Sequence, residues 1–196
     1  MYQIRLHGRG GQGVVTAAEL IAWAAIADGR YALAFPSFGS ERTGAPVEAY
    51  CRIDDNPIRS REPVTEPDLV VVLDPTLLRQ RLVFNGIKPG GTALINLSGT
   101  DPLTTGTGRV PPAAHVCTVP ATEFARQRTG RPLPNAAMLG AVAAATGIVP
   151  LAAVRDAIGA RFPGPVAEAN AAAATDAFEH LRSASHGSSE VNRVHS

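Results

Sequence analysis

The chain has 196 residues, a length that can bury the core of one domain without disulfides or a structural metal. Its 18 Lys and Arg residues nearly balance its 17 Asp and Glu residues, which argues against a general attraction to nucleic acid or to an acidic membrane. Residues 2–6 read as a strand and not as a secretion signal. We therefore expect a cytoplasmic protein with no nucleic-acid or membrane partner.

The sequence contains two cysteines, Cys51 and Cys117, which are far apart and form no CxxC pair. A zinc site or an iron–sulfur cluster needs about four ligands. We expect two reduced, buried thiols and no metal site in this chain.

The first half of the chain predicts strands around one helix. Polar and apolar residues alternate in residues 2–6 and 45–53, and residues 31–35 are a short apolar run, so each segment is expected to be a strand. The segment Val14–Ala27 has apolar residues at helical spacing. A strand, a glycine-rich loop and a helix in succession typically open a doubly wound α/β fold.

Residues 69–73 form an apolar run rich in valine, which is typical of a strand buried on both faces of a parallel sheet. Asp74 and Pro75 predict the start of a helix that ends near residue 85, because Asp accepts hydrogen bonds from free N–H groups and Pro suits the first helical position. The next expected strands are residues 92–97 and 115–119.

The rest of the chain predicts helices separated by Gly and Pro, at residues 122–128, 135–146, 151–161 and 166–182. Residues 136–154 carry no charge and are nearly long enough to span a membrane. Alanine dominates this stretch, however, and Gly147 and Pro150 interrupt it, so we expect two buried helices.

The predicted architecture is α/β: a Rossmann-like three-layer domain with a mainly parallel sheet and helices on both faces. We expect this domain to span residues 1–182. Residues 183–196 show no apolar periodicity and are expected to form a flexible C-terminal tail.

A glycine-rich loop follows the first strand and matches the pattern G-x-G-x-x-G. Its residues are the candidates for cofactor binding: Gly8, Arg9, Gly10, Gly11, Gln12 and Gly13. Backbone N–H groups and the helix N-terminus could cradle a phosphate there, and Arg9 could add a positive charge. The alternative is a tight turn that only lets the helix approach the sheet.

A dinucleotide-binding domain also needs an acidic residue at the end of the second strand, to bond the ribose hydroxyls. The chain has Phe35, Pro36, Ser37 and Phe38 at that place. This argues against NAD and is compatible with another phosphate ligand, such as coenzyme A, or with no ligand.

Three further polar residues, His7, His115 and Asp74, are candidates for a role in chemistry. His7, beside the glycine loop, could act as a base or contact an anion, but a hydrogen-bonded structural role is favoured, as it is for His115. Asp74 stands where ligand sites often lie, yet it is interpreted first as a helix cap. No Ser/His/Asp or Cys/His constellation can be argued from spacing, so no catalytic residue is assigned.

The loop over residues 36–44 carries Glu41 and Arg42 close to two phenylalanines. It could be a solvated hairpin or a surface that docks a partner. Aromatic residues so close together favour the interface.

Two longer motifs contain these features: IRLHGRGGQGVVTAA at residues 4–18 and AFPSFGSERTGAPV at residues 34–47. Both resemble the gamma subunit of pyruvate:ferredoxin oxidoreductase and its relatives, the 2-oxoacid:acceptor oxidoreductases. The resemblance covers about residues 2–180. It continues through residues 52–53, 57–59, 67–74 and 76–78, Asn135, residues 139–141 and Asn170.

The resemblance implies a subunit of a complex that oxidatively decarboxylates a 2-oxoacid, with pyruvate as the first expectation, and forms acyl-CoA and CO2. Thiamine diphosphate with Mg2+ would lie on alpha and beta subunits, and [4Fe-4S] clusters on beta and delta subunits. Electrons would pass to ferredoxin or to an NAD-linked acceptor. This chain would bind none of these cofactors alone and would have a structural role near the path of coenzyme A. An aryl substrate such as phenylglyoxylate, or a branched-chain 2-oxoacid, remains open.

Two other functions remain as alternatives. The first is a stand-alone Rossmann protein that binds NAD or NADP. The second is a purely scaffolding subunit whose glycine loop binds nothing.

Overall fold

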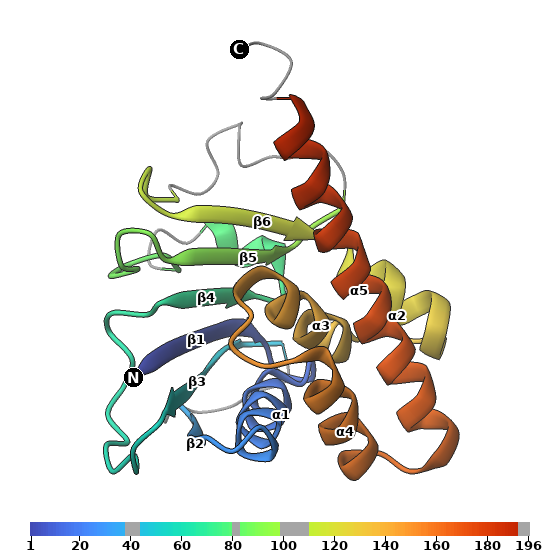
Figure 1. Ribbon diagram of the computed structural model, residues 1–196, viewed down its shortest axis with the longest axis horizontal. Helices are drawn as coiled ribbons and strands as arrows, with labels where there is room; N and C mark the ends of the chain where they lie inside the picture. The colour runs from blue at the N-terminus through green and yellow to red at the C-terminus, as the bar shows by residue number, and fades with distance from the viewer. Residues whose placement is uncertain (38–43, 80–82, 99–109, 192–196) are drawn as a thin grey trace.

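The computed structural model describes residues 1–37, 44–79, 83–98 and 110–191, the last seven of these through their backbone only. The described residues form one six-stranded sheet in the order β2-β3-β1-β4-β5-β6 (Figure 1). Strands β1, β4, β5 and β6 are parallel, and β3 runs antiparallel between β2 and β1. The predicted α/β fold with a mainly parallel sheet is confirmed.

The elements, in chain order, are β1 (Tyr2–Arg9), α1 (Val14–Ala27), β2 (Tyr31–Pro36), β3 (Pro46–Asp54), β4 (Leu69–Val72), the 3-10 helix η1 (Pro75–Arg79), β5 (Thr92–Asn96), β6 (His115–Val119), α2 (Ala121–Thr129), α3 (Asn135–Thr146), α4 (Leu151–Arg161) and α5 (Gly164–Val191). The expected strands and helices are present, most of them within one or two residues of the predicted bounds.

Two predicted helix ends were wrong. The helix expected from Pro75 to about residue 85 is the 3-10 helix η1, and residues 83–86 form a turn. Helix α5 continues to Val191, nine residues beyond its predicted end at residue 182. The flexibility of residues 183–196 and the domain boundary at residue 182 stay predictions.

The larger core lies between one face of the sheet and helices α1, α3, α4 and α5. The register of β1 with β3 pairs Ile4 with Cys51 and Leu6 with Ala49, and all four side chains belong to this core. The alternation that predicted these strands therefore follows from one shared apolar face. Burial of such side chains contributes roughly 1.5–3 kcal/mol for each large one.

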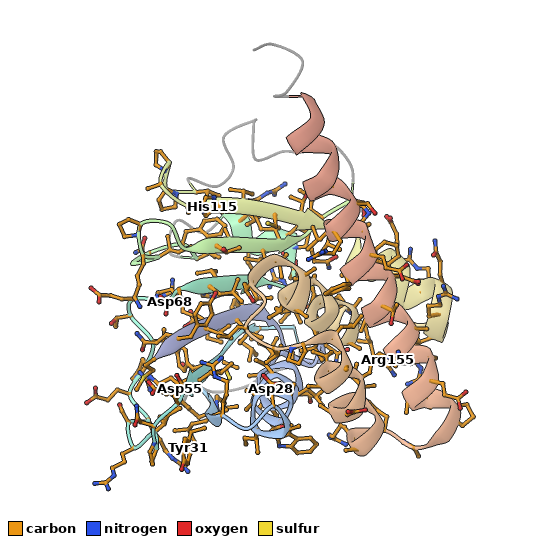
Figure 2. The ribbon with its side chains drawn as sticks, in the orientation of Figure 1. Asp28, Tyr31, Asp55, Asp68, His115 and Arg155 are labelled. Carbon is orange, nitrogen blue, oxygen red and sulfur yellow. The ribbon has the colours of Figure 1, made fainter. Side chains whose placement is uncertain are left out.

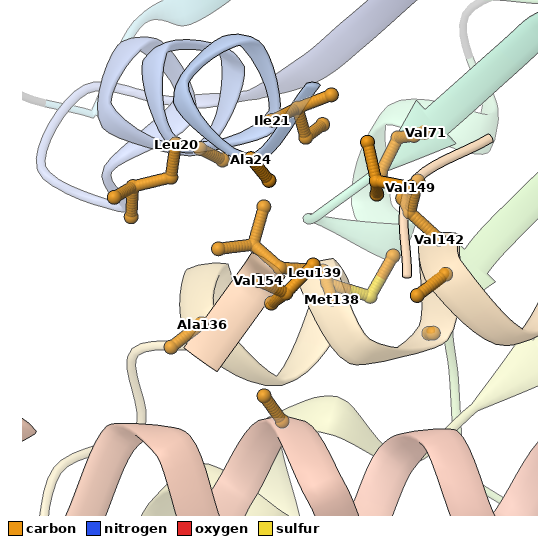
Figure 3. Packing of buried hydrophobic residues seen from close by; sticks show 14 of the residues in the cluster. Leu20, Ile21, Ala24, Val71, Ala136, Met138, Leu139, Val142, Val149 and Val154 are labelled. Carbon is orange, nitrogen blue, oxygen red and sulfur yellow. The ribbon is translucent and has the colours of Figure 1, made fainter. Parts of the chain in front are cut away.

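Helix α3 occupies the centre of this helical layer. Figure 3 shows Leu20 and Ile21 of α1 facing Leu139 and Val154, which belong to α3 and α4. On its other side α3 packs closely on α5, because Gly140 lies against the main chain of Ala174. The uncharged stretch at residues 136–154 is thus two buried helices, as predicted.

The opposite face of the sheet is covered more thinly. A smaller core joins alternate residues of β4 and β5 to η1 and to the turn that follows it. It contains Val70, Val72, Leu77, Leu78, Val83, Phe84, Ile87, Ala93 and Ile95. The two layers on the sheet are therefore unequal: in the described part of the chain, the α-helical layer on one face is opposed by a 3-10 helix and loops on the other.

Across the described ranges, no helix is both long enough and apolar enough to cross a membrane. The long helix α5 crosses the outside of the helical layer and continues beyond β6 (Figure 1). It carries charged residues such as Glu168 and Asp176 along its length.

Candidate functional site

The glycine-rich loop lies at the carboxyl ends of the parallel strands, the edge where ligands bind in open α/β sheets. Strand β1 runs through Gly8 and Arg9, and α1 begins at Val14 with Gly13 as its N-cap. Gly13 adopts a φ of +73°, and a Cβ atom there would lie 2.5 Å from Asn135 Nδ2, at the start of α3. Glycine is required at this position because the loop turns left-handed against a neighbouring helix.

The side chain of Gln12 fixes the loop from within. Its Oε1 atom accepts a hydrogen bond from the Arg9 N–H at 2.8 Å, and its Nε2 group donates to Asp74 Oδ2 at 2.9 Å. The sequence singled out Gln12 as a ligand contact, but its polar atoms are engaged by the protein. Gln12 therefore positions the loop by linking it to the end of β4.

Arg9 joins three segments of the chain. Its guanidinium donates to Thr76 Oγ1 at 2.8 Å and to the Gly44 carbonyl at 3.0 Å, and it lies 3.3 Å from Asp74. The Gly10 N–H also donates to the Ala45 carbonyl at 2.9 Å. The two sequence motifs that carry the family resemblance thus meet in space, although residues 38–43 between them, with Glu41 and Arg42, lie outside the described residues.

A hollow of about 300 Å³ opens above the N-terminus of α1. It is lined by Arg9, Gly10, Gly11, Gly13, Val14, Val15, Thr16 and Val47. The first hydrogen bond of the helix runs from Ala17 to the Gly13 carbonyl, and among the described residues no side chain forms a capping hydrogen bond to α1. The N–H groups of its first turn, which have no acceptor within the helix, are therefore available to an anion.

The predicted site residues divide into two groups. Arg9, Gly10, Gly11 and Gly13 line the hollow. Gly8 instead lies beneath it, where a Cβ atom would meet Val14 Cγ2 at 2.6 Å. The lining also includes Val14, Val15 and Thr16 of the first turn of α1, which were not among the predicted site residues. Their position directly after a glycine-rich loop could have indicated them, because anions bind at such helix N-termini.

Asp74 caps η1, as predicted, and has a second role. Its Oδ1 atom accepts hydrogen bonds from the Thr76 N–H at 2.9 Å and from Thr76 Oγ1 at 2.6 Å. Partial burial by itself would raise the pKa of Asp74, but the bonds from Thr76 and Gln12 and the charge of Arg9 outweigh it and lower the pKa. The carboxylate is therefore ionised at neutral pH and offsets part of the charge of Arg9.

His7 belongs to a buried polar network on the thinly covered face of the sheet. Its Nε2 atom accepts a hydrogen bond from Arg5 Nε at 3.1 Å, and its Nδ1 atom lies 3.4 Å from Glu48 Oε1. Burial and, to a lesser degree, the charge of Arg5 lower the pKa of His7 to about 4 against the opposing effect of Glu48. This is the hydrogen-bonded, structural histidine that the sequence favoured.

The sequence did not reveal the partner of His7 in this network. The guanidinium of Arg5 donates to the carbonyls of Val64, Val83 and Asn85, at 3.2, 3.1 and 2.6 Å. It thereby fastens two distant loops to β1. His115, by contrast, is exposed at the start of β6. It lies at the amino ends of the parallel strands, whereas the glycine loop lies at their carboxyl ends (Figure 2).

The residues that the structure describes contain no group of three or more His, Cys, Asp or Glu side chains arranged to hold a metal ion. Cys51 is fully buried, which raises the pKa of its thiol to about 12, and burial also raises the pKa of Cys117. Neither thiol carries the lowered pKa of a reactive cysteine.

The sheet order differs from that of a dinucleotide-binding domain. In that fold the second strand lies directly beside the first and presents the ribose-binding acid. Here β3 separates β2 from β1, and β2 ends in Phe35 and Pro36. The absence of an acidic residue at the end of β2 and the position of β3 between β2 and β1 both argue against a site for NAD.

The fold and the site together define a mixed-sheet α/β domain with a glycine-rich edge that can accept an anion. Residues 3–180 match the sequence model of the family described as pyruvate ferredoxin/flavodoxin oxidoreductase. The chain belongs to this family, in which it is a gamma-type subunit.

Individual relatives agree with this placement. The chain is 49% identical over 179 residues to the pyruvate/ketoisovalerate oxidoreductases common subunit gamma of Thermococcus litoralis, covering 91% of this chain and 96% of the relative. It is 47% identical over 182 residues to pyruvate synthase subunit PorC of Methanothermobacter marburgensis, covering 93% and 98%. The crystal structure of the pyruvate oxidoreductase subunit PORC of Thermotoga maritima superposes with a TM-score of 0.80 at 39% identity, covering 91% and 95%.

Proposed function

We propose that this chain is the gamma subunit of a thiamine-diphosphate and iron–sulfur enzyme that oxidatively decarboxylates pyruvate with coenzyme A to acetyl-CoA and CO2. Within that complex its own role is to receive a phosphate group of coenzyme A at residues 8–13 and the first turn of α1. The N-terminus of α1, which no described side chain caps and which faces a hollow of about 300 Å³, carries this part of the proposal.

The redox cofactors belong on other subunits. The full sequence has two cysteines, whereas a cluster needs about four thiolates. Cys51 is locked in the core, so even these two thiols do not fit a cluster. We therefore assign thiamine diphosphate, Mg2+ and the clusters to alpha, beta and delta partners, which would also hold the docking site of ferredoxin or of another acceptor.

The choice of pyruvate follows the names of the relatives, which include a pyruvate synthase subunit. One relative is named as a gamma subunit common to pyruvate and ketoisovalerate oxidoreductases. A subunit shared by two such enzymes does not select the 2-oxoacid, which supports substrate selection by partner chains. A branched-chain or aryl 2-oxoacid is therefore the alternative substrate for the same complex.

The phosphate role is tested in the assembled enzyme by Thr16→Asp, with Thr16→Asn as its matched control. Thr16 lines the hollow in the first turn of α1, where an acid favours the helix but competes with an anion for its N–H groups. Thr16→Asp should raise the KM for coenzyme A about tenfold, the effect of losing roughly 1.4 kcal/mol, with little change in kcat. Thr16→Asn, which has the same shape and no charge, should remain near the parent value.

An unchanged KM in both variants would support the scaffolding alternative, in which the loop binds nothing. The complex itself is tested separately by native mass spectrometry of the chain purified from its source. Recovery of the chain alone, without cysteine-rich and thiamine-binding partners, would contradict the subunit assignment. Binding of NADH to the isolated chain, followed through its single Trp23, would revive the dinucleotide alternative.

A further inference from the structure

A second hollow, of about 390 Å³, opens on the helical side of the molecule, where α2, α3, α4 and α5 meet. It is lined by Arg128, Thr129, Arg131, Leu133, Asn135, Phe162, Pro165, Val166, Ala169 and Asn170. This volume lies within the range of small-molecule sites, which are mostly apolar walls with a few polar groups. It is separate from the glycine-loop hollow, but the two approach each other where Asn135 lies against Gly13.

The lining of this second hollow contains two arginines, Arg128 and Arg131, and the guanidinium carbon of a third, Arg161, lies 5.7 Å from the centroid of the Phe162 ring. The lining contains no Asp or Glu. Arg128 is held by two hydrogen bonds to Asp176, at 2.7 and 2.9 Å, and is thereby neutralised. Arg131 follows the end of α2, and no ion pair engages it among the described residues. The ends of α2 and α4 and the starts of α3 and α5 all lie nearby, so their opposing dipoles largely cancel.

The walls are apolar and open to solvent. Leu133 and Val166 are 38% and 50% exposed, and Phe162, which also lines the hollow, is half-buried. Exposed aliphatic side chains grouped around one hollow are a usual mark of a binding site. The amide of Asn170 already donates to the Val166 carbonyl, which leaves its side-chain oxygen as an acceptor for a ligand.

We propose that this hollow binds a small anion that joins one carboxylate or phosphate to an apolar body, with the anion on Arg131 and the apolar body on Leu133, Phe162 and Val166. A guanidinium recognises both acid groups through two parallel hydrogen bonds. This site is independent of the phosphate role of the glycine loop.

The test uses the full-length chain labelled with 15N and titrated with phenylacetate and with phenyl phosphate. Each probe pairs an acid with one apolar ring, and a fragment of this size is expected to bind with a Kd on the order of 1 mM. Amide signals of residues 129–135 and 162–170 should move, whereas uncharged phenylacetamide and free acetate should have little effect. The tighter of the two probes shows which acid group the hollow prefers.

Arg131→Ala should weaken binding of the better probe at least about fivefold, the effect of losing roughly 1 kcal/mol. Arg126→Ala is the matched control, because Arg126 is an exposed arginine of α2 that does not line the hollow. Equal loss in both variants, or signal changes outside the two segments, would overturn the proposal. Since neither variant touches the lining of the glycine-loop hollow, their outcome is distinguishable from that of the Thr16 variants.

Discussion

The amide of Gln12 donates a 2.9 Å hydrogen bond to the carboxylate of Asp74, which lies 62 positions later in the chain. This contact joins the glycine loop to the end of β4. Because Gln12 also accepts the Arg9 N–H, both ends of its side chain have fixed partners. The shape of the glycine-loop hollow thus depends on a pair of polar residues that do not line it.

Asp74→Asn should disturb this arrangement without changing its shape. With Asn at position 74, the N–H2 group of Asn would face the N–H2 group of Gln12. If the Gln12 amide rotated to offer its oxygen instead, its N–H2 group would face the Arg9 N–H. In either arrangement one hydrogen-bond donor loses its acceptor. We expect the free energy of unfolding to fall by about 1–2 kcal/mol, measured by urea denaturation. Asp55→Asn is the control: Asp55 is 84% exposed beside Arg30, so a comparable loss there would contradict the explanation.

Gly13→Ala should destabilise the chain more than Gly11→Ala. Both residues have positive φ, +73° and +93°, and each alanine is expected to cost about 1–2 kcal/mol in backbone strain. At Gly13 the new methyl group also meets Asn135, whereas at Gly11 no atom lies within 4 Å. The extra cost, about 1–3 kcal/mol, should disappear in the Gly13→Ala/Asn135→Ala double variant.

A double-mutant cycle measures that recovery directly. Asn135→Ala alone supplies the third corner of the cycle. If the effects of the two single substitutions simply add in the double variant, the contact with Asn135 contributes nothing. Glycine is then required at position 13 for its backbone conformation alone.

The stability of the chain should fall as the pH drops from 6.5 towards 4. The pKa of His7 is about 4 in the folded protein and about 6.5 unfolded, so the unfolded chain takes up the proton first. The contribution of neutral His7 to the free energy of unfolding is fully present above pH 6.5. It is lost progressively as the pH falls towards 4, and the total loss is about 3 kcal/mol. Urea denaturation at a series of pH values measures this slope.

His7→Gln should remove most of that slope, because the Gln oxygen can still accept the hydrogen bond from Arg5 and does not titrate. Asp74 contributes a separate dependence at lower pH, since its lowered pKa stabilises the fold above the pKa of a free Asp. An unchanged slope between pH 6.5 and 4 in His7→Gln would assign the dependence to other groups.

Gly140→Ala should loosen the contact between α3 and α5. A methyl group at Gly140 would collide with the carbonyl of Ala174, and backbone atoms cannot move aside without shifting a whole helix. We expect a loss of about 2–3 kcal/mol in the free energy of unfolding. Gly159 in α4 has open space around it, so Gly159→Ala should instead stabilise by up to about 1 kcal/mol. A loss of similar size in both variants would show that helix packing is not the cause.

Local patterns predicted most of the elements because each pattern had a local cause. The strands alternate since one of their faces packs on the helices, and α3 and α4 were bounded correctly because Gly147 and Pro150 interrupt them. The helix after Asp74 was predicted too long, since its cap is readable in the sequence but its early end is not. The end of α5 was missed because apolar periodicity in the sequence ceases near residue 182, whereas the backbone stays helical to Val191.

Ligand binding by the glycine loop stays a prediction, whereas the place of the loop in the fold can be compared with the structure. The glycine pattern located the loop at the correct end of β1, but pattern alone could not separate residues that line the hollow from those that support it. The structural role of Gln12 was not predicted, because its partner Asp74 is distant in sequence; a ligand contact of Gln12 stays a prediction. Arg5, buried among loop carbonyls, gave no sequence signal, since burial of a charge depends on which loops cover it.

The sequence by itself determined the α/β class, the position of the glycine loop and the family, because apolar periodicity, glycine spacing and motifs are local properties of the chain. Only the tertiary structure decided that β3 lies between β2 and β1, that Arg9 is tied to Asp74, and that four helix ends enclose a hollow around Arg131. These features depend on contacts between distant segments, whose pairing is settled by packing and by hydrogen bonding of the whole domain.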